Sequence, residues 1–91
     1  SKDDKSSQTL IELLKVLLTH SSEISGVAQK IIATSSDLRE IAVEDIPNSR
    51  TLRGWRKEIF GSNALRLKNG EIGLSVKGKD VTIVNTNKIE I

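Results

Sequence analysis

The chain has 91 residues, 36% of them apolar, and contains neither cysteine nor methionine. This length suffices for one domain with a modest core. The missing thiols exclude a disulfide framework, a thiolate metal site and a cysteine nucleophile, and they suit a reducing cytoplasm. The net charge of +2 is unevenly spread: residues 1–49 carry five Lys/Arg against eight Asp/Glu, whereas residues 50–79 carry eight against two. The second half is therefore expected to present either an anion-attracting surface or an ordinary solvated helix face.

The N-terminal part predicts one amphipathic helix. Residues 1–7 are polar and are expected to be a disordered extension, and their lack of a methionine start indicates a piece of a larger protein. Ser6 or Ser7 is a suitable N-cap, and Gly26 ends the pattern. The apolar positions recur three and four apart over a wide arc, which predicts packing on more than one side. The longest apolar run, Val16–Leu18, is too short to span a bilayer, so no membrane partner is expected.

The middle of the chain carries clearer start and stop signals. Residues 27–33 fit a short helix or an extended segment equally well. Thr34 followed by Asp37 resembles a capping box and predicts the start of a helix. That helix must end before Pro47, because the proline ring disfavours helical backbone at the preceding residue. Asn48 or Ser49 is then expected to cap the next helix.

Residues 52–70 form the centre of the predicted fold. Leu52, Trp55 and Ile59 fall at i, i+3 and i+7 with Phe60 beside them, which predicts one apolar helix stripe. Gly54 inside that helix predicts a break or a close backbone approach, and Gly61 fits a helix C′ position. The predicted core residues include this stripe and three leucines of the earlier helices: Leu14, Leu17, Leu38, Leu52, Trp55, Ile59 and Phe60.

The same stretch predicts a cationic face. Arg50, Arg53 and Lys57 repeat the helical spacing on a different side from the apolar stripe, and guanidinium and ammonium groups bind phosphates. Because both aromatic residues are assigned to the core, no platform for base stacking is expected. RNA binding should therefore be electrostatic, non-specific and sensitive to salt. The predicted RNA-binding residues are Arg50, Arg53, Arg56, Lys57, Arg66 and Lys68.

Beyond Asn69-Gly70 the apolar period changes from 3.6 to 2, which predicts a β-hairpin at about residues 71–85. A lone hairpin is only marginally stable, so one of its faces must pack on the helices. The predicted fold is mainly α: a single domain over residues 8–91, with four to five short helices and a C-terminal hairpin.

The residue inventory predicts no catalysis and no cofactor in this chain. His20 is the single histidine and has no evident partner, and the adjacent acidic pairs lie in polar turns. A phosphate-binding glycine loop, a metal-ligand spacing and a nucleophile motif are all missing from the sequence. The chain is therefore expected not to be an enzyme by itself.

The segment ATSSDLREIA, Pro47 and then LRGWRKEIFGSNALRLKNG resemble the C-terminal region of bacterial ribonuclease D-type exoribonucleases. That region is a helicase-and-RNase-D C-terminal (HRDC)-like helical domain. The resemblance runs from about Leu10 to Leu74 and is most specific at Gly54–Gly61. The expected hairpin departs from the minimal all-helical HRDC pattern.

This resemblance implies an accessory domain of a 3′–5′ exoribonuclease that trims tRNA and other small structured RNAs. In that family a separate DEDD domain holds two divalent metal ions, and its motifs do not occur in this sequence, so no catalytic residue can be assigned here. The implied partners are RNA and the catalytic domain of the same polypeptide.

Two functions remain open from the sequence. The first is RNA positioning through the cationic face. The second is a docking module that contacts protein, suggested by the wide apolar arc of the first helix and the lack of a stacking platform. Docking predicts an exposed apolar patch. Charge reversal at Arg53 and Lys57 should abolish RNA affinity under the first function and leave it unchanged under the second.

Overall fold

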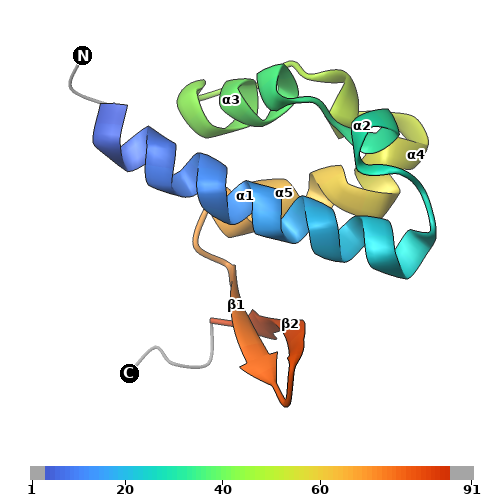
Figure 1. The fold of residues 1–91 in the computed structure, drawn as a ribbon. Helices are drawn as coiled ribbons and strands as arrows, with labels where there is room; N and C mark the ends of the chain where they lie inside the picture. Colours follow the sequence, from blue (N-terminus) through green and yellow to red (C-terminus); the bar gives the residue numbers. More distant parts are fainter. Residues whose placement is uncertain (1–3, 87–91) are drawn as a thin grey trace.

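The computed structural model describes residues 4–86, with side chains from Ser7 onward (Figure 1). It confirms the expected mainly helical fold with a C-terminal hairpin. The elements are α1 (Asp4–Ser25), α2 (Gln29–Ile32), α3 (Ser35–Val43), the 3₁₀ turn η1 (Arg50–Leu52), α4 (Gly54–Arg56), the π-helical turn η2 (Lys57–Gly61), α5 (Ser62–Lys68), β1 (Ile72–Lys77) and β2 (Asp80–Asn85).

The long helix α1 organises the core. Figure 1 shows α3 on one side of α1, α5 behind it, and the hairpin projecting on the side away from α3. The core side chains come from α1, α2, α3, η2, α5 and the first residue of β1. Leu52 and Ile59 are half-buried and pack at the edge of this cluster. The fully or almost fully buried predicted core residues are Leu14, Leu17, Leu38 and Phe60.

The ends of α1 differ from the expectation at one side only. The helix begins at Asp4, so residues 4–7 are not the disordered extension that their polar composition predicted; residues 1–3 lie outside the described part. The helix ends at Ser25, immediately before Gly26, whose φ is +78°. Residues 87–91, the end of the domain expected over 8–91, likewise lie outside the described part.

The start of α3 has the expected capping box. The Thr34 side chain accepts a hydrogen bond from the Asp37 backbone N–H at 3.3 Å, and the Asp37 carboxylate accepts one from the Thr34 backbone N–H at 2.8 Å. Two backbone donors that the first turn leaves without helical partners are satisfied in this way. The preceding ambiguous segment is resolved as the single turn α2.

The predicted core position of Trp55 is wrong. The helix expected to run from residue 50 is interrupted: η1 ends at Leu52, the next residue, Arg53, is extended (φ −137°, ψ 148°), and Gly54 follows with φ +61°. Since the backbone is not helical across this break, the spacing of Leu52 and Trp55 no longer places them on one stripe. The indole is 43% exposed, whereas Phe60 is fully buried.

Gly61 is also not the helix end that the sequence predicted. Its backbone is helical (φ −59°, ψ −41°), and the helix continues from η2 into α5. A Cβ atom at this position would lie 2.0 Å from the Thr51 carbonyl oxygen. Glycine is therefore required because the backbone of η1 crosses the helix here, so the close approach that Gly54 suggested occurs at Gly61 instead.

The end of α5 is a Schellman motif. The Gly70 N–H donates to the Leu67 carbonyl at 3.1 Å, the Glu71 N–H donates to the Arg66 carbonyl at 2.8 Å, and Gly70 has φ +79°. This geometry closes the helix at Asn69-Gly70, as the sequence predicted.

The hairpin follows directly and has antiparallel register, from Ile72 opposite Asn85 to Lys77 opposite Asp80. Its loop is Gly78-Lys79, and Gly78 has φ +67°, the conformation that a type II′ turn requires at its first central residue. Ile72 is buried in the core, so the hairpin is attached to the helices at its base.

Candidate nucleic-acid interface

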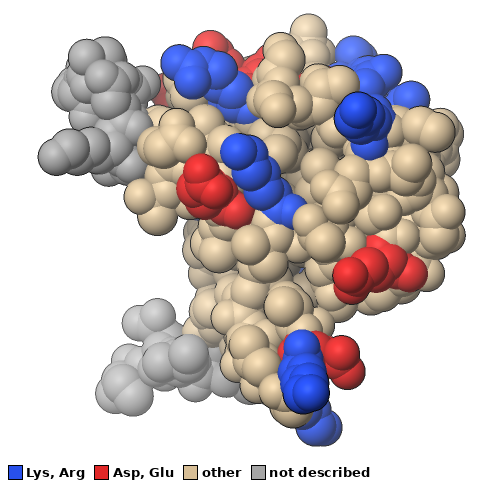
Figure 2. Space-filling view, viewed as in Figure 1, with Lys and Arg blue, Asp and Glu red and all other residues tan. Residues whose placement is uncertain are grey.

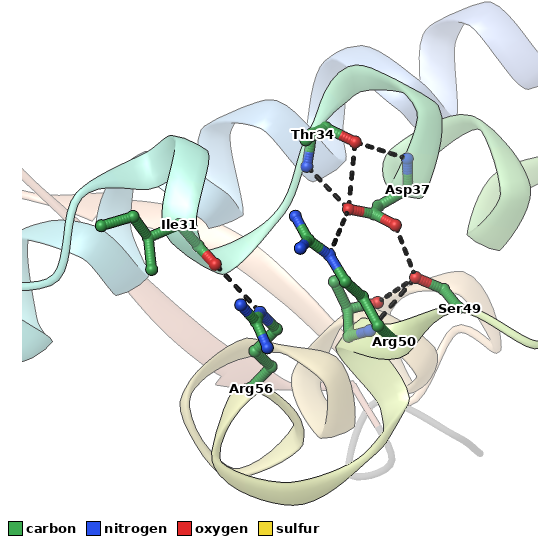
Figure 3. Close-up of polar contacts among 7 residues, drawn as sticks. Ile31, Thr34, Asp37, Ser49, Arg50 and Arg56 are labelled. Atoms are coloured by element: carbon green, nitrogen blue, oxygen red, sulfur yellow. Dashed lines mark hydrogen bonds and ion pairs between the residues drawn. The ribbon is translucent and has the colours of Figure 1, made fainter.

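The segment that carries the arginines is anchored by the carboxylate of Asp37 (Figure 3). One carboxylate oxygen accepts hydrogen bonds from the Thr34 hydroxyl at 3.0 Å and from Arg50 Nε at 3.4 Å, and the other accepts one from the Ser49 hydroxyl at 3.0 Å. The first turn of α3 is thereby bonded to η1. The ion pair with Arg50 is partly exposed and contributes little alone, so the hydrogen bonds dominate this anchor.

These contacts change the acidity of Asp37. Burial of the carboxyl group raises its pKa, but the hydrogen bonds from the Thr34 backbone, the Ser49 hydroxyl and the Thr34 hydroxyl lower it, as does the Arg50 charge. The net pKa of Asp37 lies below the ordinary value of 3.8. The carboxylate is therefore charged, and accepts these bonds, at neutral pH.

A second anchor lies beneath η1. Ser49 and Thr51 are buried, and the Ser49 hydroxyl oxygen accepts hydrogen bonds from the Thr51 N–H at 3.2 Å and from the Thr51 hydroxyl at 2.8 Å. Thr51 in turn lies with its carbonyl against Gly61. Residues 49–52 are thus held by Asp37 on one side and by Gly61 on the other. The next residue, Arg53, is exposed.

Three of the predicted cations follow this anchored turn. Arg53 is exposed, and its guanidinium donates to the Asn48 side-chain oxygen at 3.3 Å. Arg56 Nε donates to the backbone carbonyl of Ile31 at 2.9 Å. Lys57 is exposed. Among the side chains that the structure describes, those of residues 7–86, no carboxylate forms an ion pair with Arg53, Arg56 or Lys57.

Trp55 lies among these cations. The Arg56 guanidinium carbon is 4.4 Å from the centroid of the Trp55 ring, a cation–π contact. The bond to the Ile31 carbonyl holds that guanidinium in place, and Figure 3 shows Arg56 reaching across to α2. We call Arg53, Trp55, Arg56 and Lys57 the Arg-Trp surface. Sequence reasoning missed the exposure of the indole, although Gly54 beside it already signalled a break.

The other two predicted cations do not belong to this surface. Arg66 Nε lies 3.7 Å from a Glu71 carboxylate oxygen, and the Lys68 ammonium donates to the Glu44 carbonyl at the end of α3. Figure 1 places α4 at one end of the helical layer, while the C-terminal end of α5 leads into the hairpin at the other. In Figure 2 basic side chains stand in separate groups, with acidic ones between some of them. A single surface of all six residues is therefore not formed.

A different surface is apolar. Leu13 and Val16 on α1 are exposed, as is Val76 on the hairpin. Val16 and Val81 line one crevice between α1 and the hairpin tip, and Val76 is the cross-strand partner of Val81. We call Leu13, Val16, Val76 and Val81 the apolar strip. Its α1 members come from the wide apolar arc that the sequence showed.

Three further findings concern metal binding, membrane spanning and the single histidine. In the described residues, no group of three or more His, Cys, Asp or Glu side chains is placed to hold a metal ion. None of the helices between residues 4 and 86 combines the length and apolarity that a bilayer span needs. His20 is half-buried on α1, next to the crevice at the hairpin.

The fold is that of a small, mainly helical domain with an appended hairpin, and it carries exposed cations around α4. The chain is 49% identical over 80 residues to the ribonuclease D of Granulibacter bethesdensis, covering 88% of this chain and 20% of that protein. It is 46% identical over 76 residues to that of Acidiphilium cryptum (84% and 19%) and 51% over 75 residues to that of Jannaschia sp. (82% and 19%).

The chain is therefore a relative of a domain-sized segment of these ribonuclease D proteins. It spans about a fifth of the length of the curated relatives it matches. These matches confirm the resemblance that the Gly54–Gly61 stretch indicated. No protein-family model matches the chain, and no solved structure matches it significantly.

Proposed function

We propose that this chain is the C-terminal, HRDC-like accessory domain of a ribonuclease D, a 3′–5′ exoribonuclease of tRNA and small structured RNAs, and that it binds RNA beside the catalytic domain. Metal-dependent hydrolysis then belongs to the remainder of the polypeptide, with two divalent ions held there. The observation that carries the RNA-binding part is the grouping of Arg53, Arg56 and Lys57 without a carboxylate partner in the described residues.

The physical basis is the release of counterions from the RNA backbone. Each cation that neutralises a phosphate sets free condensed counterions, so affinity falls as salt rises. With about three or four phosphates engaged on a single strand, affinity should fall by roughly 20–50-fold between 50 and 200 mM salt. Arg50 contributes less, because it is already paired with Asp37.

The test is a fluorescence-anisotropy titration of labelled RNA with two charge-reversal variants. Arg53→Glu/Lys57→Glu changes the Arg-Trp surface. The matched control, Lys77→Glu/Lys79→Glu, makes the same change in net charge on the exposed hairpin end. We expect the first variant to lose binding at low salt and the control to stay close to the parent, since contacts with phosphates act locally.

Two results would overturn the proposal. One is the failure of the parent chain to bind RNA at 50 mM salt. The other is an equal loss of affinity in both variants, because that would show a dependence on total charge and not on this surface.

A second candidate function is docking onto the rest of the polypeptide, favoured by the exposed apolar strip. Each Å² of apolar surface buried in such a contact would stabilise it by about 25 cal/mol. Leu13→Lys/Val16→Lys should then weaken the association of this domain with a separately produced remainder of the protein and leave RNA affinity unchanged. An unaltered association would dismiss docking through this strip.

A further inference from the structure

We propose that Trp55 is a stacking platform for an unpaired RNA base, so that the Arg-Trp surface selects single-stranded over duplex RNA. This inference rests on the proposed function that the same surface binds RNA, and it assigns a role to a side chain for which the amphipathic pattern predicted burial.

The position of the indole is the first observation. Trp55 is the only tryptophan of the chain, and 43% of it is exposed, while the only phenylalanine is completely buried. The fold therefore places one aromatic ring in the core and the other at the surface. The left-handed Gly54 and the extended Arg53 produce this difference, because they interrupt the helix immediately before the indole.

The second observation is that the ring is held by a fixed partner. The Arg56 guanidinium lies over the indole at 4.4 Å, and its Nε is bonded to the Ile31 carbonyl at 2.9 Å. Side chains ordered before binding lose less conformational entropy when a ligand arrives. The exposed part of the indole and the neighbouring guanidinium plane both offer flat surfaces on which a nucleobase can stack.

The third observation is the charge around the ring. Arg53 lies two residues before Trp55 and Lys57 two residues after it, and both are exposed. Exposed cations of the same segment, with the Arg56 guanidinium against the ring itself, are thus available to the phosphates of a nucleotide stacked on the indole. Bases inside a duplex are already stacked on each other and cannot occupy the ring, so this arrangement favours unpaired nucleotides.

The sole tryptophan supplies a direct readout in the 91-residue chain. At 50 mM salt, titration with a single-stranded RNA oligomer should quench the intrinsic fluorescence of Trp55 to saturation. An abasic ribose-phosphate oligomer of the same length should bind more weakly and leave the fluorescence nearly unchanged, and a duplex of the same length should also quench little.

Substitutions test the affinity. Trp55→Ala should weaken single-strand binding by about 5- to 150-fold, the effect of losing one stacked base. Trp55→Phe should retain much of the affinity, because a smaller ring still stacks. Circular dichroism of each variant checks the fold, and the abasic comparison on the unmodified chain gives an answer that does not depend on any variant folding.

The outcomes separate this inference from the proposed function. Equal affinity for the abasic and natural oligomers without quenching, or undiminished binding by a folded Trp55→Ala variant, would overturn stacking. If the variant Arg53→Glu/Lys57→Glu still lost affinity for RNA, the RNA-binding proposal would stand. The exposed indole would then be assigned to a contact with protein. No binding by the parent chain would remove both.

Discussion

At the scale of single residues, Asp37 joins two parts of the chain that lie twelve residues apart. Its carboxylate completes the capping box of α3 and accepts the Ser49 hydroxyl at the start of η1. The first role is local and visible in the sequence. The second depends on where the chain returns after Pro47, and it makes this carboxylate a determinant of the Arg-Trp surface.

Replacing Asp37 by asparagine should lower the free energy of unfolding at pH 7 by about 1–2 kcal/mol, because hydrogen bonds to a charged acceptor are weakened or lost. The pKa of Asp37 is lowered in the folded state, so its stabilisation is complete above the unfolded value near 3.9 and is lost as pH falls through the lower folded value. Urea unfolding between pH 3 and pH 7 should therefore show a shallower acid decline in Asp37→Asn.

The exposed turn residue Asp45 provides the control. Asp45→Asn should unfold with the parent chain across this pH range. A variant Asp37→Asn that keeps the parent's stability and acid profile would mean that the carboxylate does not anchor η1.

At the scale of elements, the crossing of η1 over η2 decides the shape of the Arg-Trp surface. The Thr51 carbonyl lies against Gly61, and the helix passes through a π-helical turn at the same place. A π turn adds one residue to a helical ladder and often marks a functional site. The backbone contact and the extra residue together set how α4 emerges from the bundle.

Gly61→Ala should destabilise the chain by about 3 kcal/mol, because the new Cβ would meet a backbone oxygen at 2.0 Å and the backbone must shift. Gly73→Ala is the matched control: its Cβ would meet side-chain atoms no nearer than 3.5 Å. Chemical unfolding of both variants measures the difference. Equal stability of the two would contradict the close crossing of η1 and η2.

At the scale of the whole molecule, the two aromatic residues differ in burial. Phe60 is enclosed by the core that α1, α3 and α5 share, whereas Trp55 is exposed beside cations. The apolar strip lies at the hairpin and on α1, and the Arg-Trp surface lies around α4. One small domain thus offers two chemically different surfaces.

Phe60→Ala should cost about 3–5 kcal/mol, a large part of the stability of a domain of this length. Trp55→Ala should cost about 2 kcal/mol or less, since much of its ring is already in water. Urea denaturation followed by circular dichroism compares the two. A loss as large for Trp55→Ala as for Phe60→Ala would place the indole in the core.

Local patterns predicted much of the fold. The capping box at Thr34, the helix end at Gly70 and the change of apolar period that marks the hairpin depend on neighbouring residues. The structure has all three where the sequence indicated. The candidate site was less predictable. The spacing of Arg50, Arg53 and Lys57 assumed one helix, while the structure has a 3₁₀ turn, a break and a second helix.

The sequence by itself determined the class of the fold, the start of α3, the C-terminal ends of α1 and α5, and the concentration of positive charge in residues 50–79, because each follows from chemistry within a few consecutive residues. Only the tertiary structure decided which of those charges share a surface and which aromatic ring faces water. Both depend on the return of the chain after Pro47, where Asp37 and Gly61 hold η1, and contacts between residues ten or more apart leave no periodic pattern in a sequence.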